Sequence, residues 1–202
     1  MAGLNRPGST DSGDGTGYRS PDDFGTAAER NGVVGSSDEH DARFAHLAEG
    51  NAHQARKRVA ADVLIRDPAG RVLVVDPTYK QGWDLPGGMI EANESPRTGA
   101  RRELTEELRL AVVPGRPLVI EWVDAHGPWD DQIVLVFDGG TLTDAQIAAI
   151  EIGDDEIADW RFVDPHEPDV PLRAHLRWRL GHAVDALASD TVRYLERDPL
   201  AT

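Results

Sequence analysis

The order in which two kinds of apolar pattern alternate along the chain is the feature that most constrains its fold. Runs rich in β-branched residues at 59–66 and 72–76 flank the turn-forming residues Asp67-Pro-Ala-Gly, which predicts a β-hairpin. Apolar residues at helical spacing follow in 96–108 and again in 172–187. Strands alternating with helices in this way are typical of a sheet that is covered by helices.

The rest of the pattern predicts how the sheet is completed. Further strands are expected at 118–123, 133–137 and 160–163, and the continuously apolar second one indicates burial on both faces. A short helix is expected over 144–150. A C-terminal helix should pack one apolar stripe on the sheet, formed by Leu172, Leu176, Leu180, Val184 and Leu187. The predicted fold class is α/β, an α/β/α sandwich of a mixed β-sheet with flanking helices.

Residues 1–50 differ in composition from the rest of the chain. They are rich in Gly, Ser, Asp and Thr and show no sustained period, which predicts a disordered or loosely ordered N-terminal tail. A short helix is expected across 41–54. The folded domain is expected over 55–190, including the C-terminal helix, because 202 residues suffice for one core domain with some tail left over.

Composition excludes several classes of function. There is no cysteine, which removes thiolate metal sites and cysteine nucleophiles, so any metal must bind oxygen or imidazole ligands. The formal net charge of −15 opposes binding to polymeric nucleic acid. No segment offers the roughly 18 apolar residues of a membrane span, and the N-terminus lacks a targeting pattern. We therefore expect a cytoplasmic protein with a small-molecule substrate and no membrane partner.

Three glutamates on the helix at 96–108 carry the chemical signal. Ser95 is the expected N-cap of this helix and Pro96 its first residue. At 3.6 residues per turn, Glu106 and Glu107 lie about 60° behind and about 40° ahead of Glu103. The three carboxylates therefore share one arc of the helix surface, where they would repel one another if nothing lay between them.

The environment expected for these acids favours a divalent cation. An apolar stripe of Ala100, Leu104 and Leu108 runs beside the arc, which places the acids at the edge of the core. Clustered carboxylates of this kind suit Mg²⁺ or Mn²⁺, and a guanidinium at Arg102 can orient one of them. An acidic helix is also typical of a solvated surface, so the spacing of the whole segment has to decide between the two interpretations.

That spacing resembles the signature of the Nudix hydrolase family. Gly88 is followed by five residues, Glu94, seven residues and then Arg102-Glu-Leu-Thr-Glu-Glu-Leu-Arg-Leu. Family-like sequence extends over roughly 59–164 and includes Trp83-Asp-Leu-Pro-Gly-Gly. One position departs, because Arg109 stands where the family has glycine. That glycine commonly ends the helix in a left-handed conformation, where another residue costs on the order of 1 kcal/mol.

The resemblance implies a Mg²⁺-dependent hydrolase, with Mn²⁺ as a possible replacement, that cleaves a phosphoanhydride by attack of water at phosphorus. Glu94 is expected to be structural. Asp155 and Glu156 lie in an acidic loop where family members often place another metal ligand or base, although a solvated turn explains them equally well. The implied catalytic residues are Glu103, which we favour as general base, Arg102 and Glu106, and the implied metal ligands are Gly87, Glu103, Glu106 and Glu107.

The substrate is the least constrained part of the prediction. The expected class is a nucleoside diphosphate linked to another group, such as a dNTP, ADP-ribose or a nucleotide sugar. Trp83, Trp122 and Trp129 are able to stack on a base, and His126 lies in a loop that can approach it, although core packing and a functionless loop explain them too. A non-nucleotide diphosphate such as a prenyl diphosphate, a non-catalytic Nudix-like ligand sensor, and a homodimer all remain open.

Overall fold

The computed structural model describes residues 37–196 of a chain that divides into two units, Met1–Ala55 and Arg56–Thr202. In the first unit, α1 spans Ser37–Ala52 and none of its residues is buried. This helix begins four residues before the predicted 41–54 and ends two residues earlier. The prediction of a tail concerns mostly residues that lie outside the described range. None of the helices in 37–196 is long and apolar enough to cross a membrane.

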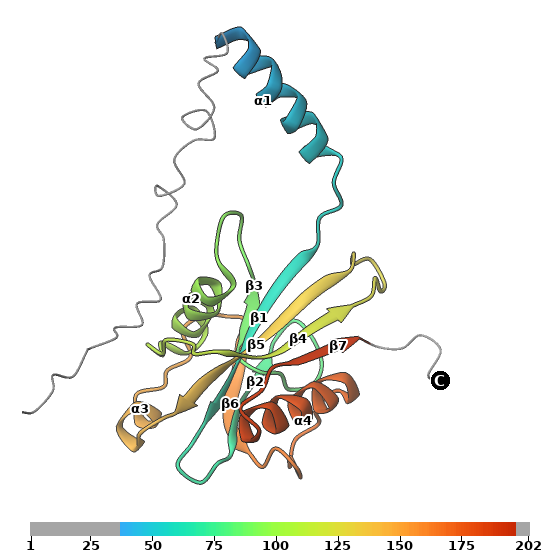
Figure 1. The fold of residues 1–202 in the computed structure, drawn as a ribbon. Coiled ribbons are helices and arrows are strands. Elements are labelled where there is room, and N and C mark those ends of the chain that lie inside the picture. The colour runs from blue at the N-terminus through green and yellow to red at the C-terminus, as the bar shows by residue number, and fades with distance from the viewer. Residues whose placement is uncertain (1–36, 197–202) are drawn as a thin grey trace, which may run out of the picture. The chain divides into compact units, whose positions relative to one another are not determined.

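A seven-stranded mixed sheet forms the centre of the second unit (Figure 1). Its strand order is β6-β2-β1-β5-β4-β7, and β3 pairs with β1 beside this path. The predicted hairpin is present as the antiparallel pair β1 and β2, and the other three predicted strands are present as β4, β5 and β6. The strands are β1 Arg58–Arg66, β2 Val72–Pro77, β3 Gly87–Met89, β4 Pro117–Val123, β5 Gln132–Thr141, β6 Ile157–Val163 and β7 Arg193–Glu196.

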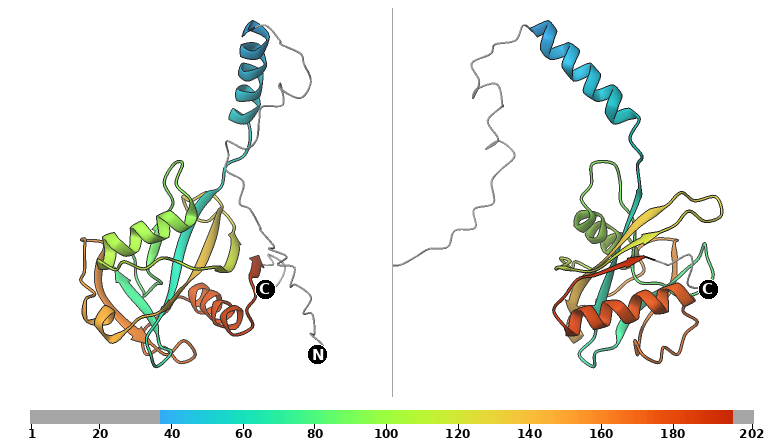
Figure 2. Two further views of the ribbon diagram at one scale, coloured as in Figure 1. Left: turned by 60° about the vertical axis from the view of Figure 1, so that its left-hand side comes forward. Right: turned by 45° about the vertical axis from the view of Figure 1, so that its right-hand side comes forward.

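Helices cover both faces of this sheet, which confirms the predicted fold class. The helix α2 (Pro96–Leu108) lies on one face and α4 (Ala174–Ala188) on the other, while α3 (Asp144–Ala148) is a short connecting helix (Figure 2). The predicted C-terminal helix starts later than its apolar stripe, because Leu172 forms a parallel bridge with Trp83 and α4 begins only after it.

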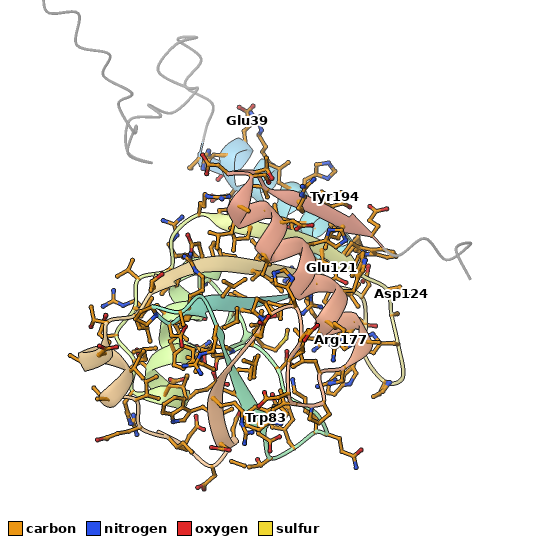
Figure 3. All side chains as sticks on the ribbon, turned by 90° about the horizontal axis from the view of Figure 1, so that it is seen from below. Glu39, Trp83, Glu121, Asp124, Arg177 and Tyr194 are labelled. Carbon is orange, nitrogen blue, oxygen red and sulfur yellow. The ribbon has the colours of Figure 1, made fainter. Side chains whose placement is uncertain are left out.

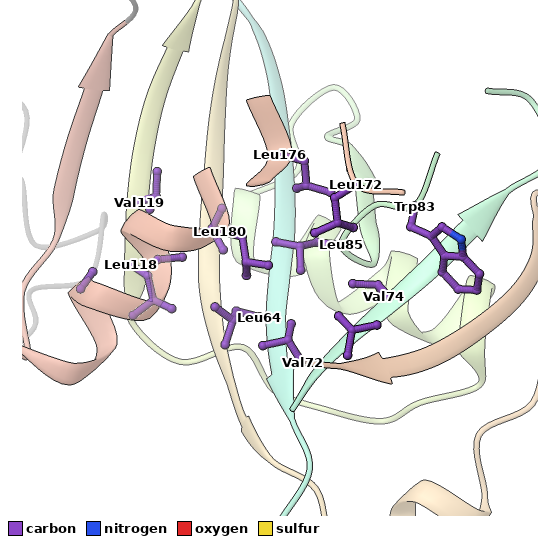
Figure 4. Packing of buried hydrophobic residues seen from close by; sticks show 14 of the residues in the cluster. Leu64, Val72, Val74, Trp83, Leu85, Leu118, Val119, Leu172, Leu176 and Leu180 are labelled. Atoms are coloured by element: carbon purple, nitrogen blue, oxygen red, sulfur yellow. The ribbon is translucent and has the colours of Figure 1, made fainter. Parts of the chain in front are cut away.

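The two faces have separate hydrophobic cores, as the period-2 alternation of a strand requires. On β1, Leu64 packs towards α4 together with Leu176 and Leu180 (Figure 4). Its neighbours Val63 and Ile65 belong to the opposite core, which contains the buried stripe of α2. The sheet is thus covered by helices on both faces, and an internal edge remains beside β1, where β2 and β3 separate.

This internal edge forms because β2 and β3 pair with different parts of β1 and leave it uncovered between them. The first half of β1 pairs with β3, with Asp62 opposite Gly87, whereas its far end pairs with β2, with Arg66 opposite Val72. The two partners occupy the same side of β1, and Val63 N donates to Pro86 O where they separate. This arrangement brings the Gly87-Gly88 backbone to the middle of the sheet, under the glutamates of α2.

The strand β7, parallel to β4, was not predicted. It has four residues, and only Leu195 is buried. A strand this short, with a single buried side chain, has no alternation for a sequence pattern to detect.

Candidate active site

The helix α2 begins and ends where the sequence predicted. Ser95 caps it, with its side chain accepting from Thr98 N, and Pro96 is the first helical residue. At the other end, Arg109 is in the left-handed region with φ 52° and ψ 26°. The expected strained exit from the helix is therefore present, and the three glutamates Glu103, Glu106 and Glu107, called the box glutamates below, keep their helical spacing.

Arg102 is the centre of the charged cluster on α2. Its guanidinium donates to Glu94 through Nε (3.1 Å) and Nη2 (3.0 Å), and Nη1 donates to both Glu103 (3.0 Å) and Glu106 (2.9 Å). Nη2 also donates to Met89 O at 3.1 Å. The hydrogen bonds from Arg102 lower the pKa of Glu94. Glu94 thus contacts the arginine instead of the free N–H groups of the helix, which is consistent with the structural role we expected.

Glu103 lies directly against the glycine pair. A Cβ atom at Gly88 would be 2.6 Å from the carboxyl carbon of Glu103, so only glycine permits this approach. Burial, and then like charge from Glu106 and Glu156, raises the pKa of Glu103. A half-buried carboxylate pressed against exposed backbone is a position from which it can bind a cation or accept a proton.

Glu107 is the buried member of the box glutamates, with only 4% of its surface exposed. Its Oε2 accepts from Gly87 N at 3.0 Å. Gly87 has φ 138°, and a Cβ there would be 2.3 Å from Ala61 O, so no other residue fits the strand pairing. Burial raises the pKa of Glu107 to about 8, whereas a bound cation would favour the charged carboxylate.

The donor set fits a hard divalent cation, although it is not assembled as a metal site. Within residues 37–196, no three His, Cys, Asp or Glu side chains are grouped so that they could hold a metal ion. The reason is visible in the hydrogen bonds, because Arg102 binds Glu103 and Glu106 while Gly87 binds Glu107. Carboxylate and carbonyl oxygens are the ligands that Mg²⁺ and Mn²⁺ prefer.

A cavity of about 890 Å³ opens beside these residues. Gly87, Gly88, Arg102, Glu103 and Glu106 line one end of it, whereas the buried Glu107 is not part of its lining.

The acidic loop (residues 151–156) contributes to the same end of the cavity. Glu156 lines it, but Asp155 does not, and the carbonyl of Asp155 accepts from Thr78 Oγ1 at 2.9 Å. Asp154, which was not predicted, lines the cavity instead. Residues 154–156 form a turn in which Glu156 N donates to Asp154 Oδ1 at 3.0 Å, so Asp154 and Glu156 lie together.

The other end of the cavity is formed by the loop between β4 and β5, residues 124–131, called the hairpin tip. His126 and Trp129 line the cavity there, together with Arg58 from the start of β1. Trp129 is 55% exposed, and the guanidinium carbon of Arg58 lies 4.8 Å from its ring centroid. An exposed tryptophan beside an arginine provides an apolar, electron-rich surface for a planar group.

The other two predicted tryptophans do not line the cavity. Trp83 is buried in the core on the α4 side, with the Arg161 guanidinium 4.4 Å from its ring, and it lies well apart from Asp124 of the hairpin tip (Figure 3). Trp122 is half-buried and donates from Nε1 to Asp131 at 3.1 Å. Both side chains follow the more common use of tryptophan in packing, so the structure gives no support to a substrate role for them.

The wall opposite the box glutamates contains charged residues that sequence reasoning missed. Arg179 of α4 is buried and forms ion pairs with Asp62 of β1 (3.2 Å) and with Glu121 of β4, which lies next to α4 in Figure 3. Burial raises the pKa of Asp62 to about 7. Nearby, Asp84 accepts from Lys80 at 2.7 Å and forms an ion pair with Arg173 at 3.5 Å. Apart from Lys80 and Asp84, which are four residues apart, these pairs join residues far apart in the sequence, so no local motif indicates them.

Comparisons with known proteins agree with the fold and the signature. The model of the NUDIX domain matches residues 56–185. A MutT-like protein of Streptomyces ambofaciens is 40% identical over 52 residues, which are 26% of this chain and 33% of that relative, so the match spans only about a third of its length.

Solved structures of low sequence identity share the fold. A UDP-X diphosphatase superimposes with a TM-score of 0.61 at 18% identity, over 77% of this chain and 74% of that one. An ADP-ribose pyrophosphatase from Streptococcus suis 89-1591 superimposes with a TM-score of 0.53 at 18% identity, over 70% and 100% of the two chains.

Proposed function

Because the chain belongs to the NUDIX family, we propose that it is a Mg²⁺- or Mn²⁺-dependent hydrolase of a small nucleoside-diphosphate derivative. The observation that carries this proposal is the cavity, which combines the carboxylates of α2 with an exposed tryptophan and an arginine at its far end. A diphosphate at the first end and a planar base at the second suit these two linings.

The proposed metal ligands are the box glutamates and the carbonyl of Gly87. A divalent cation bound there would screen the negative charge of the diphosphate and polarise the phosphorus under attack. For binding, Glu103 and Glu106 must exchange Arg102 for the cation, and both lie on the cavity wall where this exchange is open to solvent. Arg102 would then remain held by Glu94, beside the site.

The proposed reaction is substitution by water at phosphorus. The water oxygen forms a bond to phosphorus, the bridging oxygen of the phosphoanhydride leaves with its electron pair, and the proton of the water passes to a carboxylate. We assign that role to Glu103, because it lines the cavity beside Gly88 and one of its two carboxylate oxygens can take a proton while the other faces the cation. Asp154 and Glu156 are proposed as additional ligands or bases on the facing loop.

Trp129 is proposed to stack on the base of the substrate, with His126 beside it. Stacking on an aromatic side chain is worth about 1–3 kcal/mol per base. The structural neighbours named above are a UDP-X diphosphatase and an ADP-ribose pyrophosphatase, which makes sugar-linked nucleoside diphosphates the first compounds to test. A prenyl chain lacks a planar ring, so it could bury apolar surface against Trp129 but could not stack on it.

The test is a product assay with Mg²⁺ and a panel of ADP-ribose, nucleotide sugars, dNTPs, dinucleoside polyphosphates and prenyl diphosphates. Glu103→Gln should lower kcat roughly a hundredfold or more, since it removes the proposed base at nearly constant shape. Trp129→Ala should raise KM roughly tenfold with kcat little changed. Trp178→Ala is the matched control, because this tryptophan is 37% exposed on α4 and does not line the cavity.

Each other outcome has a clear meaning. Cleavage of prenyl diphosphates alone, unaffected by Trp129→Ala, would replace the nucleotide substrate with the non-nucleotide one. Binding of a nucleotide without turnover, in wild type and variants alike, would contradict the enzyme and favour a ligand sensor.

A further inference from the structure

Arg109 occupies a backbone position that disfavours it. Its φ of 52° and ψ of 26° lie in the left-handed region, where a non-glycine residue is strained. The backbone of the helix end is otherwise ordinary, with Arg109 N donating to Thr105 O at 3.2 Å and Leu110 N donating to Leu104 O at 3.1 Å. Glycine would complete the same turn without strain, so the backbone gives no reason for an arginine here.

The side chain of Arg109 contacts the acidic loop. Its Nη2 donates to Gly153 O at 2.7 Å. Gly153 N in turn donates to Glu107 O at 2.8 Å, and Glu151 N donates to Leu108 O at 3.1 Å. The loop thus accepts one hydrogen bond from Arg109 and donates two to carbonyls at the end of α2.

This contact is close as well as hydrogen-bonded. A Cβ atom at Gly153 would lie 1.9 Å from Glu106 O, so the loop backbone rests directly on the last turn of α2. The next residues are also fixed, because Thr78 Oγ1 donates to Asp155 O (2.9 Å) and Thr78 N donates to Glu156 O (2.8 Å). The acidic loop is therefore held at one end by Arg109 and at the other by Thr78.

The loop needs such fastening because its acids face like charges. Asp154 and Glu156 line the cavity with the box glutamates Glu103 and Glu106. Four carboxylates around one space repel one another, and the acidic loop is the movable side, since Glu103 and Glu106 belong to a packed helix. A fixed guanidinium at the C-terminal end of α2 also suits the negative end of the helix dipole.

We propose that Arg109 is a positioning residue that fastens the acidic loop to the end of α2 and thereby keeps Asp154 and Glu156 in the cavity. The strain at its backbone is offset by this contact. The inference rests on the proposed function for its effect on turnover, but the fastening itself is a property of the fold.

Replacing Arg109 with glycine distinguishes an effect on the position of the acidic loop from an effect on the stability of the fold. Arg109→Gly relieves the left-handed strain but also removes the hydrogen bond to Gly153 O, so its Tm should change by less than about 3 °C. Activity should fall despite this near-constant stability, with kcat lowered roughly tenfold to a hundredfold as the loop acids shift, and KM little changed. Amide exchange at Glu151 and Gly153, whose N–H groups donate to the end of α2, should be roughly tenfold faster in the variant. Arg109→Lys, which keeps one donor, should recover part of kcat.

Asp190→Gly is the matched control. Asp190 also has a positive φ, of 51°, but it is exposed and does not line the cavity. This variant should gain stability with kcat and loop exchange unchanged. Arg109→Gly with wild-type kcat and wild-type exchange would overturn the proposal. A wild-type protein without hydrolase activity would remove the proposed function alone, and faster loop exchange in Arg109→Gly would still support the fastening.

Discussion

Two arginines in this unit each bind more than one carboxylate, and they differ chiefly in exposure. Arg102, 25% exposed, binds Glu94 and Glu103, which are 12% and 16% exposed, and Glu106, which is 51% exposed. Arg179 binds Asp62 and Glu121 between α4 and the sheet, where all three side chains are at most 12% exposed. The first network can exchange partners with water and ions through Glu106, whereas the second is more deeply buried and only Arg179 and Asp62 reach the cavity lining.

We expect this difference to separate a functional cluster from a structural one of the same chemistry. Removing one partner of a buried ion pair leaves an uncompensated charge, while an exposed pair is replaced by water at little cost. The buried network also lacks further hydrogen bonds that could replace a lost ion pair, because Oε1 of Glu121 has no hydrogen-bond partner among the described residues. We therefore expect changes in the Arg179 network to affect folding and changes in the Arg102 network to affect metal binding.

The largest expected effect is on folding. Arg179→Met should lower the free energy of unfolding by about 3–5 kcal/mol, because Asp62 and Glu121 then remain buried without their cation. Urea denaturation measures this loss, with Arg102→Met as the comparison, for which about 1 kcal/mol or less is expected. Adding Asp62→Asn and Glu121→Gln to Arg179→Met should recover part of the stability. Equal losses for the two arginine variants would show that burial does not distinguish the networks.

Metal binding should have a smaller effect on the free energy of unfolding, and this effect should depend on the Arg102 network alone. At a Mg²⁺ concentration a hundredfold above Kd, the free energy of unfolding should rise by about 2.7 kcal/mol. Glu103→Gln should abolish most of this gain, whereas Glu167→Gln, an exposed acid that does not line the cavity, should keep it. A gain that survives Glu103→Gln would place the cation elsewhere in the molecule.

The two networks also show what the sequence could predict. Glu103, Glu106, Glu107 and Arg102 lie within one short helix, so their spacing alone predicted a shared face and a resemblance to a known signature. Asp62, Glu121 and Arg179 are 58 to 117 residues apart in their pairings, and only the strand pairing and the docking of α4 bring them together. Local periodicity carries no information about such contacts.

For the fold too, the parts with a local sequence pattern were predicted and those that depend on long-range pairing were not. Strands with several buried residues, such as β1 and β2, were predicted within a residue or so, because their apolar runs are long and bounded by turn residues. Of the three tryptophans named as able to stack on a base, only Trp129 lines the cavity, and the sequence did not distinguish it from the other two for a physical reason. Tryptophan packs equally well in a core and at a rim, and the position of the hairpin tip depends on the pairing of β4 with β5.

The smallest expected effect concerns competition between Arg102 and the metal. In the structure, Nη1 of Arg102 occupies oxygens of Glu103 and Glu106 that the proposed cation needs. Removing that competitor at an exposed site is worth about 1 kcal/mol, so Arg102→Met should bind Mg²⁺ about fivefold more tightly. Calorimetric titration measures this, with Arg101→Met as control, because Arg101 is exposed on the same helix and makes no ion pair within residues 37–196. Since both variants lose one positive charge, the difference between them isolates direct competition from the general rise in negative potential. Equal Mg²⁺ affinities for Arg102→Met and Arg101→Met would mean that Arg102 does not compete with the cation for Glu103 and Glu106. The idea that the Arg102 network exchanges its partners for a metal ion would then be wrong.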